Sequence, residues 1–486
     1  MTARRAFLGI DCGTQSTKAL LLDMEGEVLA VGRADHDLIE APDGTREQDP
    51  RWWTDAAVTA VRAALSAAGG VEVGGIGVSG QQHGLVALDA GDRPVRPAKL
   101  WNDTSTTAEA RALTDALGGE AAVLSLTGNL FLPGYTAPKV AWLRDHEPDN
   151  YAAARRFCLP HDYLNLWLTG SYATEPGDAS GTAYVDARSR SYCRPVLAAL
   201  DEARDWDATL PAIGDSLAVH GQLQRTTAEL LGLPAGVPVS GGGGDNMCSA
   251  IGVGAVVEGP TLVSLGTSGT AFAFHSQPAV DAEGEAAAFC SSTGGWLPLV
   301  CTLNCTLATE WIRREMGLDR AGFEAALAAS PPGSRGVTFL PYLAGERTPN
   351  APSATAAFSG IHAGHDRNDL VRAVAEGVIL GLAYGLRALA RAGCHPTDVT
   401  LVGGGAASDG LAQLCADAFD LPVRRDPEPE AAALGAARQA ACVVEDIPLP
   451  SPATTGERFE PRAADALHAA AERLAVLRAA AVARDR

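Results

Sequence analysis

Long hydrophobic runs are missing from this chain of 486 residues, although 47% of its residues are hydrophobic. No run reaches the roughly 18 uninterrupted apolar residues that a membrane-spanning helix needs, so we predict no membrane span. The apolar run at residues 7–10 ends at Asp11. It is shorter than the about 7–15 apolar residues of a secretory signal, so no such signal is predicted.

Cysteine and positive charge are also scarce. The chain has 10 Cys, and pairs such as Cys301 and Cys305 lack the spacing of a zinc site or a disulfide framework. We therefore expect reduced thiols and a cytoplasmic protein. The 38 Lys and Arg against 58 Asp and Glu give a net charge of −20, which argues against binding to nucleic acid or to an acidic membrane surface. A local phosphate pocket is compatible with this charge, because backbone amides and a few cations can form one.

The N-terminal region predicts three short strands and a helix. Residues 7–10, 18–23 and 28–31 are apolar segments separated by turns, which is typical of a β-meander. A helix is predicted to begin near residues 49–50, because Pro is favoured in the first turn, and to end at Gly69-Gly70. The apolar segment 73–78 predicts the next strand.

Two segments half a chain apart share one pattern. Residues 8–17 and 261–270 both read as an apolar strand, Gly-Thr, two small or polar residues, Thr and a new strand. Two matched hairpins predict a duplicated domain with a cleft between the copies. The length predicts about two to four domains, and we expect two large lobes, at residues 1–244 and 245–486.

Later segments predict helices. Residues 369–392 predict a long helix in which glycines at 377, 381 and 385 share one face and allow a neighbour to approach closely. The Ala-rich segments 430–443 and 463–484 predict helices on the outside of the molecule.

The two Gly-Thr turns are candidate phosphate sites. Glycine lets backbone N–H groups face phosphate oxygens, the Thr14 and Thr267 hydroxyls add donors, and Lys18 adds a cation. One such turn is weak evidence, because hairpins also use Gly for geometry, but the matched pair favours a nucleotide phosphate clamp. Asp11 beside the first turn is a candidate to hold Mg²⁺ through water; a turn-capping role is the alternative.

A glycine-rich segment at residues 240–244 leads directly into Asp245 and Asn246. A carboxylate at this place can accept a proton from a sugar hydroxyl that attacks phosphorus, and the amide can hold a second hydroxyl. The alternative is a glycine-rich connection whose Asp caps the next helix. The local sequence leaves both interpretations open.

Polar residues follow the strand that is predicted to end at Val78. Gln82 and His83 offer neutral donors and acceptors suited to a polyol, at the strand end where α/β sheets bind ligands. Trp101 either adds to the ligand contacts of Gln82 and His83 or belongs to the core. Residues 403–408 connect a strand to a helix and leave room for adenine and ribose, although the chain has no Walker A sequence.

Together these motifs resemble the FGGY family of carbohydrate kinases from about residue 7 to about residue 440. Residues 134–146 are similar to the first family signature throughout, and residues 358–376 approach the second. Ala375 departs from it, since a larger apolar residue is usual there. Residues 339–349 are typical of the members that phosphorylate xylulose.

The resemblance implies an α/β fold of two actin-like lobes, each a ribonuclease-H-like domain, with ATP and a sugar in a central cleft. It implies Asp245 as the catalytic base and Asp11 as the acid associated with Mg²⁺. The sugar contacts that we expect are Gln82, His83, Asn246 and Trp101. The contacts expected for ATP are Thr14, Lys18, Gly266 and Thr267 at the phosphates and Gly404, Gly405 and Ser408 near adenosine. The resemblance also suggests a homodimer.

The reaction implied is transfer of the γ-phosphoryl group of ATP to the 5-hydroxyl of D-xylulose. Glycerol is disfavoured, because glycerol kinases carry Arg-Glu-Thr where this chain has residues 82–84. Some relatives that phosphorylate xylulose carry a basic residue soon after Trp-Asn-Asp, where this chain has Thr104-Ser105-Thr106. The alternatives are a kinase for another ketose or polyol (ribulose, fuculose or an alditol), an actin-like or chaperone-like ATPase, and a sugar-sensing regulator.

Overall fold

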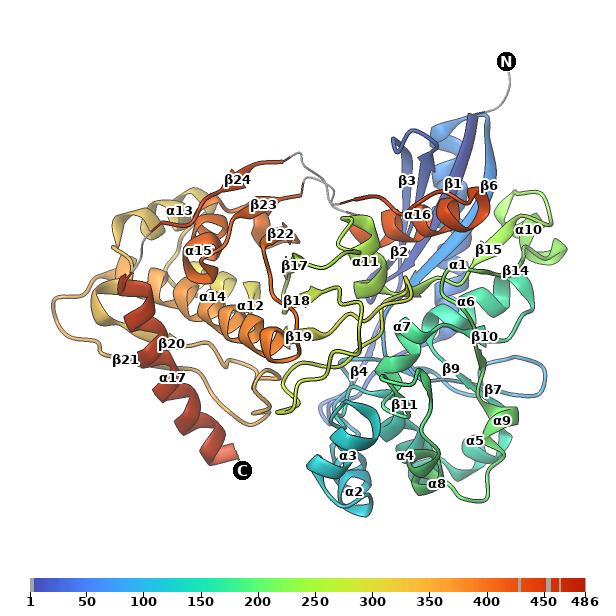
Figure 1. Ribbon diagram of the computed structural model, residues 1–486, viewed down its shortest axis with the longest axis horizontal. Coiled ribbons are helices and arrows are strands. Elements are labelled where there is room, and N and C mark those ends of the chain that lie inside the picture. Colours follow the sequence, from blue (N-terminus) through green and yellow to red (C-terminus); the bar gives the residue numbers. More distant parts are fainter. Residues whose placement is uncertain (1–3, 427–429, 452–455, 463–464, 486) are drawn as a thin grey trace.

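The computed structural model describes residues 4–426, 430–451, 456–462 and 465–485, and its chain forms two lobes (Figure 1). The sheet of the first lobe has the strand order β14-β15-β6-β1-β2-β3, with β16 beside β6, and that of the second lobe has the order β19-β18-β17-β22-β23-β24. The strands of the first sheet are β1 (Arg4–Cys12), β2 (Ser16–Asp23), β3 (Val28–Asp35), β6 (Val71–Gly80), β14 (Val219–Gln222), β15 (Pro238–Ser240) and β16 (Gly243–Gly244). Those of the second sheet are β17 (Pro260–Leu265), β18 (Gly269–Ala273), β19 (Leu299–Thr302), β22 (Asp398–Val402), β23 (Val423–Arg425) and β24 (Arg458–Phe459).

The two sheets have the same topology. In the first, β1 pairs antiparallel with β2, β2 with β3, and β1 lies parallel to β6, which is followed by parallel β15 and antiparallel β14. In the second, β17, β18 and β19 form the same antiparallel meander, and β17 is followed by parallel β22 and β23 and antiparallel β24. The two Gly-Thr turns occupy equivalent places, so the predicted duplication and the two-lobed α/β fold are confirmed.

The first helix, α1 (Pro50–Ala68), begins and ends where the sequence predicts. Asp49 accepts a hydrogen bond from the backbone N–H of Arg51, Pro50 occupies the first turn, and Gly69 with φ +59° ends the helix. Its buried face packs on β2 and β3, with Trp53 fully buried. The helix therefore covers one face of the meander that carries the first Gly-Thr turn.

The helix predicted at 430–443 is present as α16 (Ala431–Glu445), but its predicted outer location is wrong, because most of α16 is buried in the core. It returns to the first lobe and packs against β1, β6 and α11 (Asp245–Gly252), as the red helix beside the blue strands shows (Figure 1). Glycines allow this contact: a Cβ on Gly9 would lie 1.9 Å from the Ala433 carbonyl oxygen, and one on Gly435 would lie 1.7 Å from that of Cys248. An Ala-rich face fits such a glycine-lined surface.

The long helix α14 (Arg367–Arg391) forms the centre of the second lobe. Its length and apolar composition would suffice for a membrane span, but 72% of the most apolar window is buried in the fold, as in the core helix of a globular domain. Two of the three predicted glycine contacts are confirmed, since Gly377 lies against Phe339 and Gly385 against Val300. A Cβ on Gly381 would meet nothing within 4 Å, so no close approach occurs there.

The remaining elements surround these two sheets. The helices are α2 (Thr107–Ala116), α3 (Glu120–Thr127), α4 (Thr136–His146), α5 (Pro148–Ala153), α6 (Pro160–Thr169), α7 (Pro176–Ala179), α8 (Arg194–Leu200), α9 (Trp206–Thr209), α10 (Arg225–Leu231), α12 (Thr306–Glu315), α13 (Arg320–Ala329), α15 (Asp409–Phe419) and α17 (Asp465–Asp485), with 3₁₀ turns η1 (Ser180–Thr182), η2 (Ser334–Gly336) and η3 (Gly404–Ala407). The small strands are β4 (Ile39–Glu40), β5 (Arg46–Gln48), β7 (Val86–Leu88), β8 (Ala98–Lys99), β9 (Arg156–Cys158), β10 (Ala173–Thr174), β11 (Val185–Asp186), β12 (Ser191–Tyr192), β13 (Ala212–Ile213), β20 (Thr338–Leu340) and β21 (Ala357–Ser359). The predicted helix 463–484 corresponds to α17, except that its first two residues lie outside the described residues.

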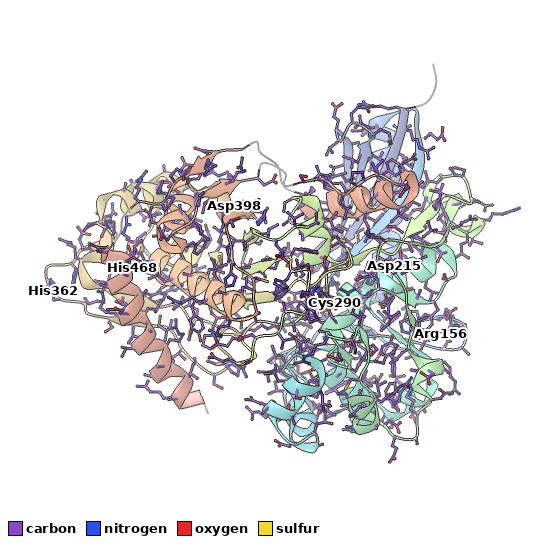
Figure 2. The ribbon with its side chains drawn as sticks, in the orientation of Figure 1. Arg156, Asp215, Cys290, His362, Asp398 and His468 are labelled. Atoms are coloured by element: carbon purple, nitrogen blue, oxygen red, sulfur yellow. The ribbon has the colours of Figure 1, made fainter. Side chains whose placement is uncertain are left out.

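A loop of the second lobe packs on the first and joins their cores. Cys290 lies near the middle of the molecule, where its backbone N–H donates to the Ser180 hydroxyl at 2.9 Å (Figure 2). Phe289 belongs to one apolar cluster with Tyr135 of the first lobe. This loop fixes one side of the space between the lobes.

Candidate active site

A cavity of about 2080 Å³ lies between the two lobes. The predicted sugar contacts Gln82, His83, Trp101 and Asn246 line it, and so does Asp245. From the second lobe, Gly266 lines the same cavity together with Ser264, Ser268 and Thr270 of the second hairpin. We call the four predicted sugar contacts the sugar wall. The predicted base, the sugar wall and the second Gly-Thr turn thus line one cavity.

The sugar wall begins at the carboxyl end of β6. Gln82 is buried, and its Oε1 accepts a hydrogen bond of 2.8 Å from Asn246 Nδ2, whereas its Nε2 has no partner among the described residues. An unused buried donor at this place suits a ligand oxygen. Burial, with the charges of Lys139 and Arg347, holds the pKa of His83 well below its usual value, so this imidazole is neutral at pH 7. The wall therefore offers neutral hydrogen-bonding groups.

Asp245 is placed by the strand and helix that meet at it. β16 pairs with β6, and α11 begins directly after it, with Gly244 and not Asp245 as its N-cap. Asp245 Oδ1 accepts hydrogen bonds from Asn246, from the backbone N–H at 2.8 Å and from Nδ2 at 3.0 Å. The alternative that Asp245 is merely a capping residue is therefore not what the structure has.

The environment raises the pKa of Asp245 to about 7. Its location deep in the cleft is the main cause, and the negative charges of Asp11 and Asp178 add to it. The side chain is nevertheless half-exposed to the cavity. A carboxylate with this pKa is a stronger base than an ordinary Asp, and at neutral pH a large fraction of it is ionised.

Asp11 lies on β1 and is buried, and its charge acts on Asp245. Its Oδ1 accepts a hydrogen bond of 2.8 Å from the Ser79 hydroxyl, and its cross-strand neighbour is Lys18, which forms an ion pair of 2.5 Å with Glu430. Burial raises the pKa of Asp11, and the Lys18 charge opposes that shift. Neither Asp11 nor Lys18 lines the cavity.

The residues present fit Mg²⁺. Asp11 and Asp245 are close enough for the charge of Asp11 to raise the pKa of Asp245, and a divalent cation would relieve this repulsion between oxygen ligands. No cluster of three or more His, Cys, Asp or Glu side chains suited to a metal occurs among the described residues. A cation here would accordingly take most of its ligands from water and phosphate.

The predicted phosphate contacts differ in what they do. The Thr14 hydroxyl donates to Gln81 Oε1 at 3.1 Å and accepts from Trp101 Nε1 at 2.9 Å, so it holds the sugar wall in place. The Gly266 carbonyl accepts from the Thr306 N–H, and the Thr267 carbonyl accepts from that of Cys305. The second turn is thereby fixed to the start of α12.

The three predicted adenosine contacts lie outside the lining of the cavity. Gly404 faces open space, because a Cβ there would meet nothing within 4 Å, whereas one on Gly405 would lie 2.8 Å from Thr306 Cγ2. The Ser408 hydroxyl accepts a hydrogen bond of 3.0 Å from the Leu411 N–H and caps α15. Gly404 is thus exposed and the Ser408 hydroxyl is used by the helix, so the contacts with adenosine stay a prediction.

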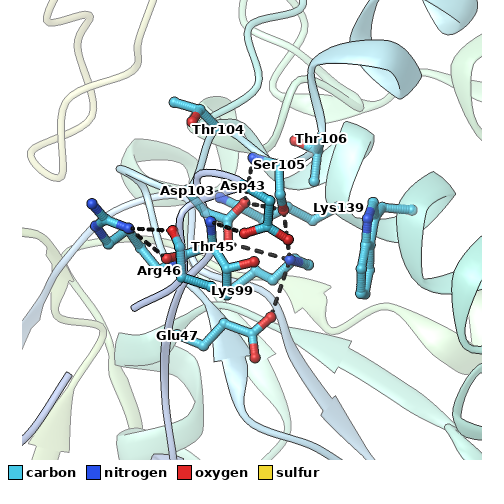
Figure 3. A network of polar contacts seen from close by, with 12 residues as sticks. Asp43, Thr45, Arg46, Glu47, Lys99, Asp103, Thr104, Ser105, Thr106 and Lys139 are labelled. Carbon is cyan, nitrogen blue, oxygen red and sulfur yellow. Dashed lines mark hydrogen bonds and ion pairs between the residues drawn. The ribbon is translucent and has the colours of Figure 1, made fainter. Parts of the chain in front are cut away.

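A buried polar network supports the sugar wall from below (Figure 3). The fully buried Lys99 Nζ lies 3.2 Å from Asp103 Oδ2 and 3.0 Å from Glu47 Oε1, and it donates to the Ser105 hydroxyl at 2.8 Å. Asp103 Oδ2 also accepts from the Arg46 backbone N–H. This network fixes the segment that carries Trp101.

Sequence reasoning gave no role to several residues at the cavity. Ser264, Ser268 and Thr270 lie in the second hairpin, so the hairpin pattern itself contained the signal. Arg347 also lines the cavity, and it lies in the segment 339–349 that is typical of relatives. Asp178 does not line the cavity, but its charge helps to raise the pKa of Asp245; it is buried with His161, whose Nδ1 lies 2.6 Å from its Oδ2.

Comparisons with known proteins show the family of both parts of the chain. Residues 6–252 match the N-terminal domain of the FGGY family of carbohydrate kinases, and residues 261–443 match its C-terminal domain. The chain is 42% identical over 442 residues to the xylulose kinase of Haemophilus influenzae, covering 89% of this chain and 90% of that one.

Solved structures give the same result. A xylulose kinase structure from Bifidobacterium adolescentis has a TM-score of 0.84 at 34% identity, covering 98% of this chain and 99% of that one. The structure described as a xyloylose kinase from Brucella ovis has a TM-score of 0.93 at 35% identity, covering 99% of this chain and 100% of that one. By sequence and by structure, the chain belongs to the FGGY family of carbohydrate kinases.

Proposed function

We propose that this chain transfers the γ-phosphoryl group of ATP to the 5-hydroxyl of D-xylulose. The observation that carries the proposal is that Asp245, the neutral sugar wall and the second Gly-Thr turn line one cavity between the lobes. The chain is similar to xylulose kinases over about nine-tenths of its length, and this similarity supports xylulose as the substrate.

Asp245 is the general base in this proposal. It accepts the proton of the sugar hydroxyl as that oxygen approaches phosphorus, while Gln82, His83 and Asn246 hold the sugar. A loose phosphoryl-transfer transition state needs little base strength, so positioning contributes most of the rate. The pKa of about 7 is well suited to a base at neutral pH.

Charge on the phosphates is balanced from both Gly-Thr turns. Backbone N–H groups at Thr14, Gly266 and Thr267 face the phosphates, and Lys18 supplies a positive charge. Asp11 and Asp245 would hold Mg²⁺, which when bound neutralises charge on the phosphate oxygens. Gly404 and Gly405 lie beside the adenosine.

A neutral sugar is supported by the chemistry of the wall. Gln82, Asn246 and a neutral His83 provide donors and acceptors without a cluster of cations, and a phosphorylated or strongly acidic substrate would favour such a cluster. Cytoplasmic location is part of the proposal, since all ten cysteines are free thiols. A homodimer stays a prediction of the family resemblance.

The test is an ADP-release assay with a panel of sugars. D-xylulose, D-ribulose, L-fuculose, xylitol, glycerol and gluconate are each added with ATP and Mg²⁺. We expect the largest kcat/KM with D-xylulose and a product phosphorylated at the 5-position in the ³¹P NMR spectrum. ADP release that does not depend on any sugar would instead indicate an actin-like ATPase.

A further inference from the structure

Three arginines line the cavity among the described residues, and they have different surroundings. Arg111 is exposed on α2. Arg478 on α17 lies 3.7 Å over the ring of Tyr384. Arg347 is half-buried, and it extends from the second lobe to the sugar wall of the first.

The position of the Arg347 guanidinium follows from the glycine that it lies against. A Cβ on Gly134 would come 2.7 Å from Arg347 Nη2 and 2.3 Å from the Trp101 carbonyl oxygen. Because Gly134 has no Cβ, there is room for the Arg347 guanidinium next to the Trp101 backbone. Any side chain at this position would push the guanidinium out of the wall.

The charge of Arg347 acts on both sides of the sugar end of the cavity. Burial and Lys139 are the larger causes of the lowered pKa of His83, and Arg347 adds to them. On the other side, Arg347 opposes the burial that raises the pKa of the Cys301 thiol on β19. The cation that acts on Asp11 is Lys18 instead. Arg347 thus belongs to the sugar end, not to the first phosphate turn.

Arg347 has no ion pair among the described residues, although Glu346 is its chain neighbour. The two Glu346 oxygens are used elsewhere: Oε1 accepts from the backbone N–H groups of Leu303 and Arg347 at 2.7 and 2.8 Å, and Oε2 accepts from Asn304 Nδ2 at 3.2 Å. The guanidinium donors are therefore not consumed by a carboxylate.

The two lysines near the sugar wall, Lys99 and Lys139, already have protein partners and are not open to a ligand. Lys99 is held by Glu47 and Asp103 (Figure 3). Lys139 is fully buried and donates to the His83 carbonyl oxygen at 2.7 Å and to that of Gly134. Both support the backbone, which leaves Arg347 as the cation at the sugar end that is open to a ligand.

We propose that Arg347 is a sugar-binding residue supplied by the second lobe, whose guanidinium donates hydrogen bonds to oxygens of the sugar held by Gln82, His83 and Asn246. The proposal rests on the proposed function. A guanidinium presents its N–H groups as a rigid fork, which matches two neighbouring oxygens such as those of a hydroxyketone or a vicinal diol. It supplies the basic contact that the uncharged Thr104-Ser105-Thr106 segment lacks.

Contact from the second lobe also couples sugar binding to lobe closure. The other proposed sugar contacts reach the cavity from β6 and α11, which pack together in the first lobe through β16 and α16. A sugar that contacts Arg347 as well therefore bridges the two lobes. We expect its binding to favour the closed arrangement of the cavity.

The test compares Arg347→Gln and Arg347→Lys with Arg111→Gln, which removes the same charge from an exposed position on α2 at the same cavity. Arg347→Gln is expected to raise the KM for D-xylulose at least about tenfold, consistent with loss of charge-assisted hydrogen bonds, and to weaken sugar binding in calorimetry without nucleotide. Arg347→Lys is expected to fall between, because it keeps the charge but not the fork. The KM for ATP and the Arg111→Gln enzyme are expected to stay near wild type.

Each other outcome has a defined meaning. An unchanged KM for D-xylulose in Arg347→Gln, or a rise confined to the KM for ATP, overturns the proposal. Guanidinium ion added to Arg347→Ala is expected to lower its KM for the sugar, and a purely structural role would not give this rescue. If Arg347→Gln fails to fold, Arg347→Lys decides by the same readout. A wild-type enzyme without turnover of D-xylulose would refute the proposed function instead.

Discussion

Asp245 combines two properties that oppose each other. Its place in the cleft suits a base, but the same place favours the uncharged form, so folding carries a cost when the carboxylate is ionised. Since its pKa is raised from the ordinary Asp value to about 7, the protein loses stability as the pH rises from the unfolded-state pKa through about 7. Above that range the loss is complete.

Asp245→Asn removes this titration and leads to a prediction for stability. The variant is expected to gain melting temperature over the wild type as the pH is raised from 5 to 8, because the amide is never charged. Differential scanning calorimetry at several pH values measures the difference. A difference that is the same at pH 5 and pH 8 would show that Asp245 does not have a raised pKa.

Lys99 is the buried cation of the polar network beside Trp101. Its side chain is 1% exposed, and it pairs with Asp103 and Glu47, which are 0% and 9% exposed. Lys99→Met leaves the buried Asp103 carboxylate without its cation, whereas Glu47 keeps its ion pair of 2.7 Å with Arg96. Removing one partner of a buried pair typically costs about 3–5 kcal/mol of unfolding free energy. Urea denaturation measures the loss. Arg33→Met, which breaks an exposed pair with Asp35, is the control and should change little.

The sequence could predict those site residues that are placed by the strand directly before them, and it could not predict residues placed by a contact far away in the chain. Gln82, His83, Asp245 and Asn246 each follow a strand directly, and the structure brings them to one cavity. Arg347 had no such signal, because its position depends on a contact with Gly134 across the cleft. Local sequence does not encode a contact between lobes.

At the scale of elements, the packing of α16 depends on glycines. A Cβ on Gly435 would lie 1.7 Å from the Cys248 carbonyl oxygen, and this backbone atom cannot move without shifting α11. Gly435→Ala is therefore expected to destabilise the protein by roughly 1–3 kcal/mol, as for overpacking of a core.

Gly381 on α14 is the matched control for this prediction. Since a Cβ there meets nothing within 4 Å, Gly381→Ala is expected to stabilise the protein by about 0.5–1 kcal/mol through helix propensity. Chemical denaturation of both variants measures the two signs. Equal effects at Gly435 and Gly381 would contradict the packing described for α16.

Elements with local signals were predicted well. The β-meander, α1 with Pro50 in its first turn and Gly69 at its end, and the second hairpin follow from turn residues and apolar periodicity. The burial of α16 was not predictable in this way. An Ala-rich helix has no distinct polar face that would show which side is buried. The strand glycines that contact it lie more than 300 residues earlier in the chain, as in the contact of Ala433 with Gly9.

At the scale of the whole molecule, the cavity is bounded by parts that belong to different lobes. Residues of α2 and α3, including Arg111 and Glu120, line it from the first lobe, and residues of α17, including Arg478 and Val482, line it from the second. Its volume of about 2080 Å³ is well above the roughly 300–1,000 Å³ of ordinary ligand pockets. We therefore expect the lobes to close on the substrates.

Small-angle X-ray scattering tests this closure. The radius of gyration is expected to fall when D-xylulose and a non-hydrolysable ATP analogue are both present, and to fall less with either alone. Asp245→Asn should close to a similar extent, because the amide keeps an oxygen at this place and the sugar contacts Gln82, His83 and Asn246 are unchanged. A radius of gyration that does not respond to both ligands would mean that the cavity works at its open size.

The role of Asp245 as the base is measured by sugar-dependent ADP release in the wild type and in Asp245→Asn. We expect D-xylulose to stimulate ADP release by the wild type, and Asp245→Asn to lower this rate at least about a hundredfold while ATP binding changes little. An Asp245→Asn enzyme that releases ADP at nearly the wild-type rate with D-xylulose would contradict the claim that this carboxylate is the base.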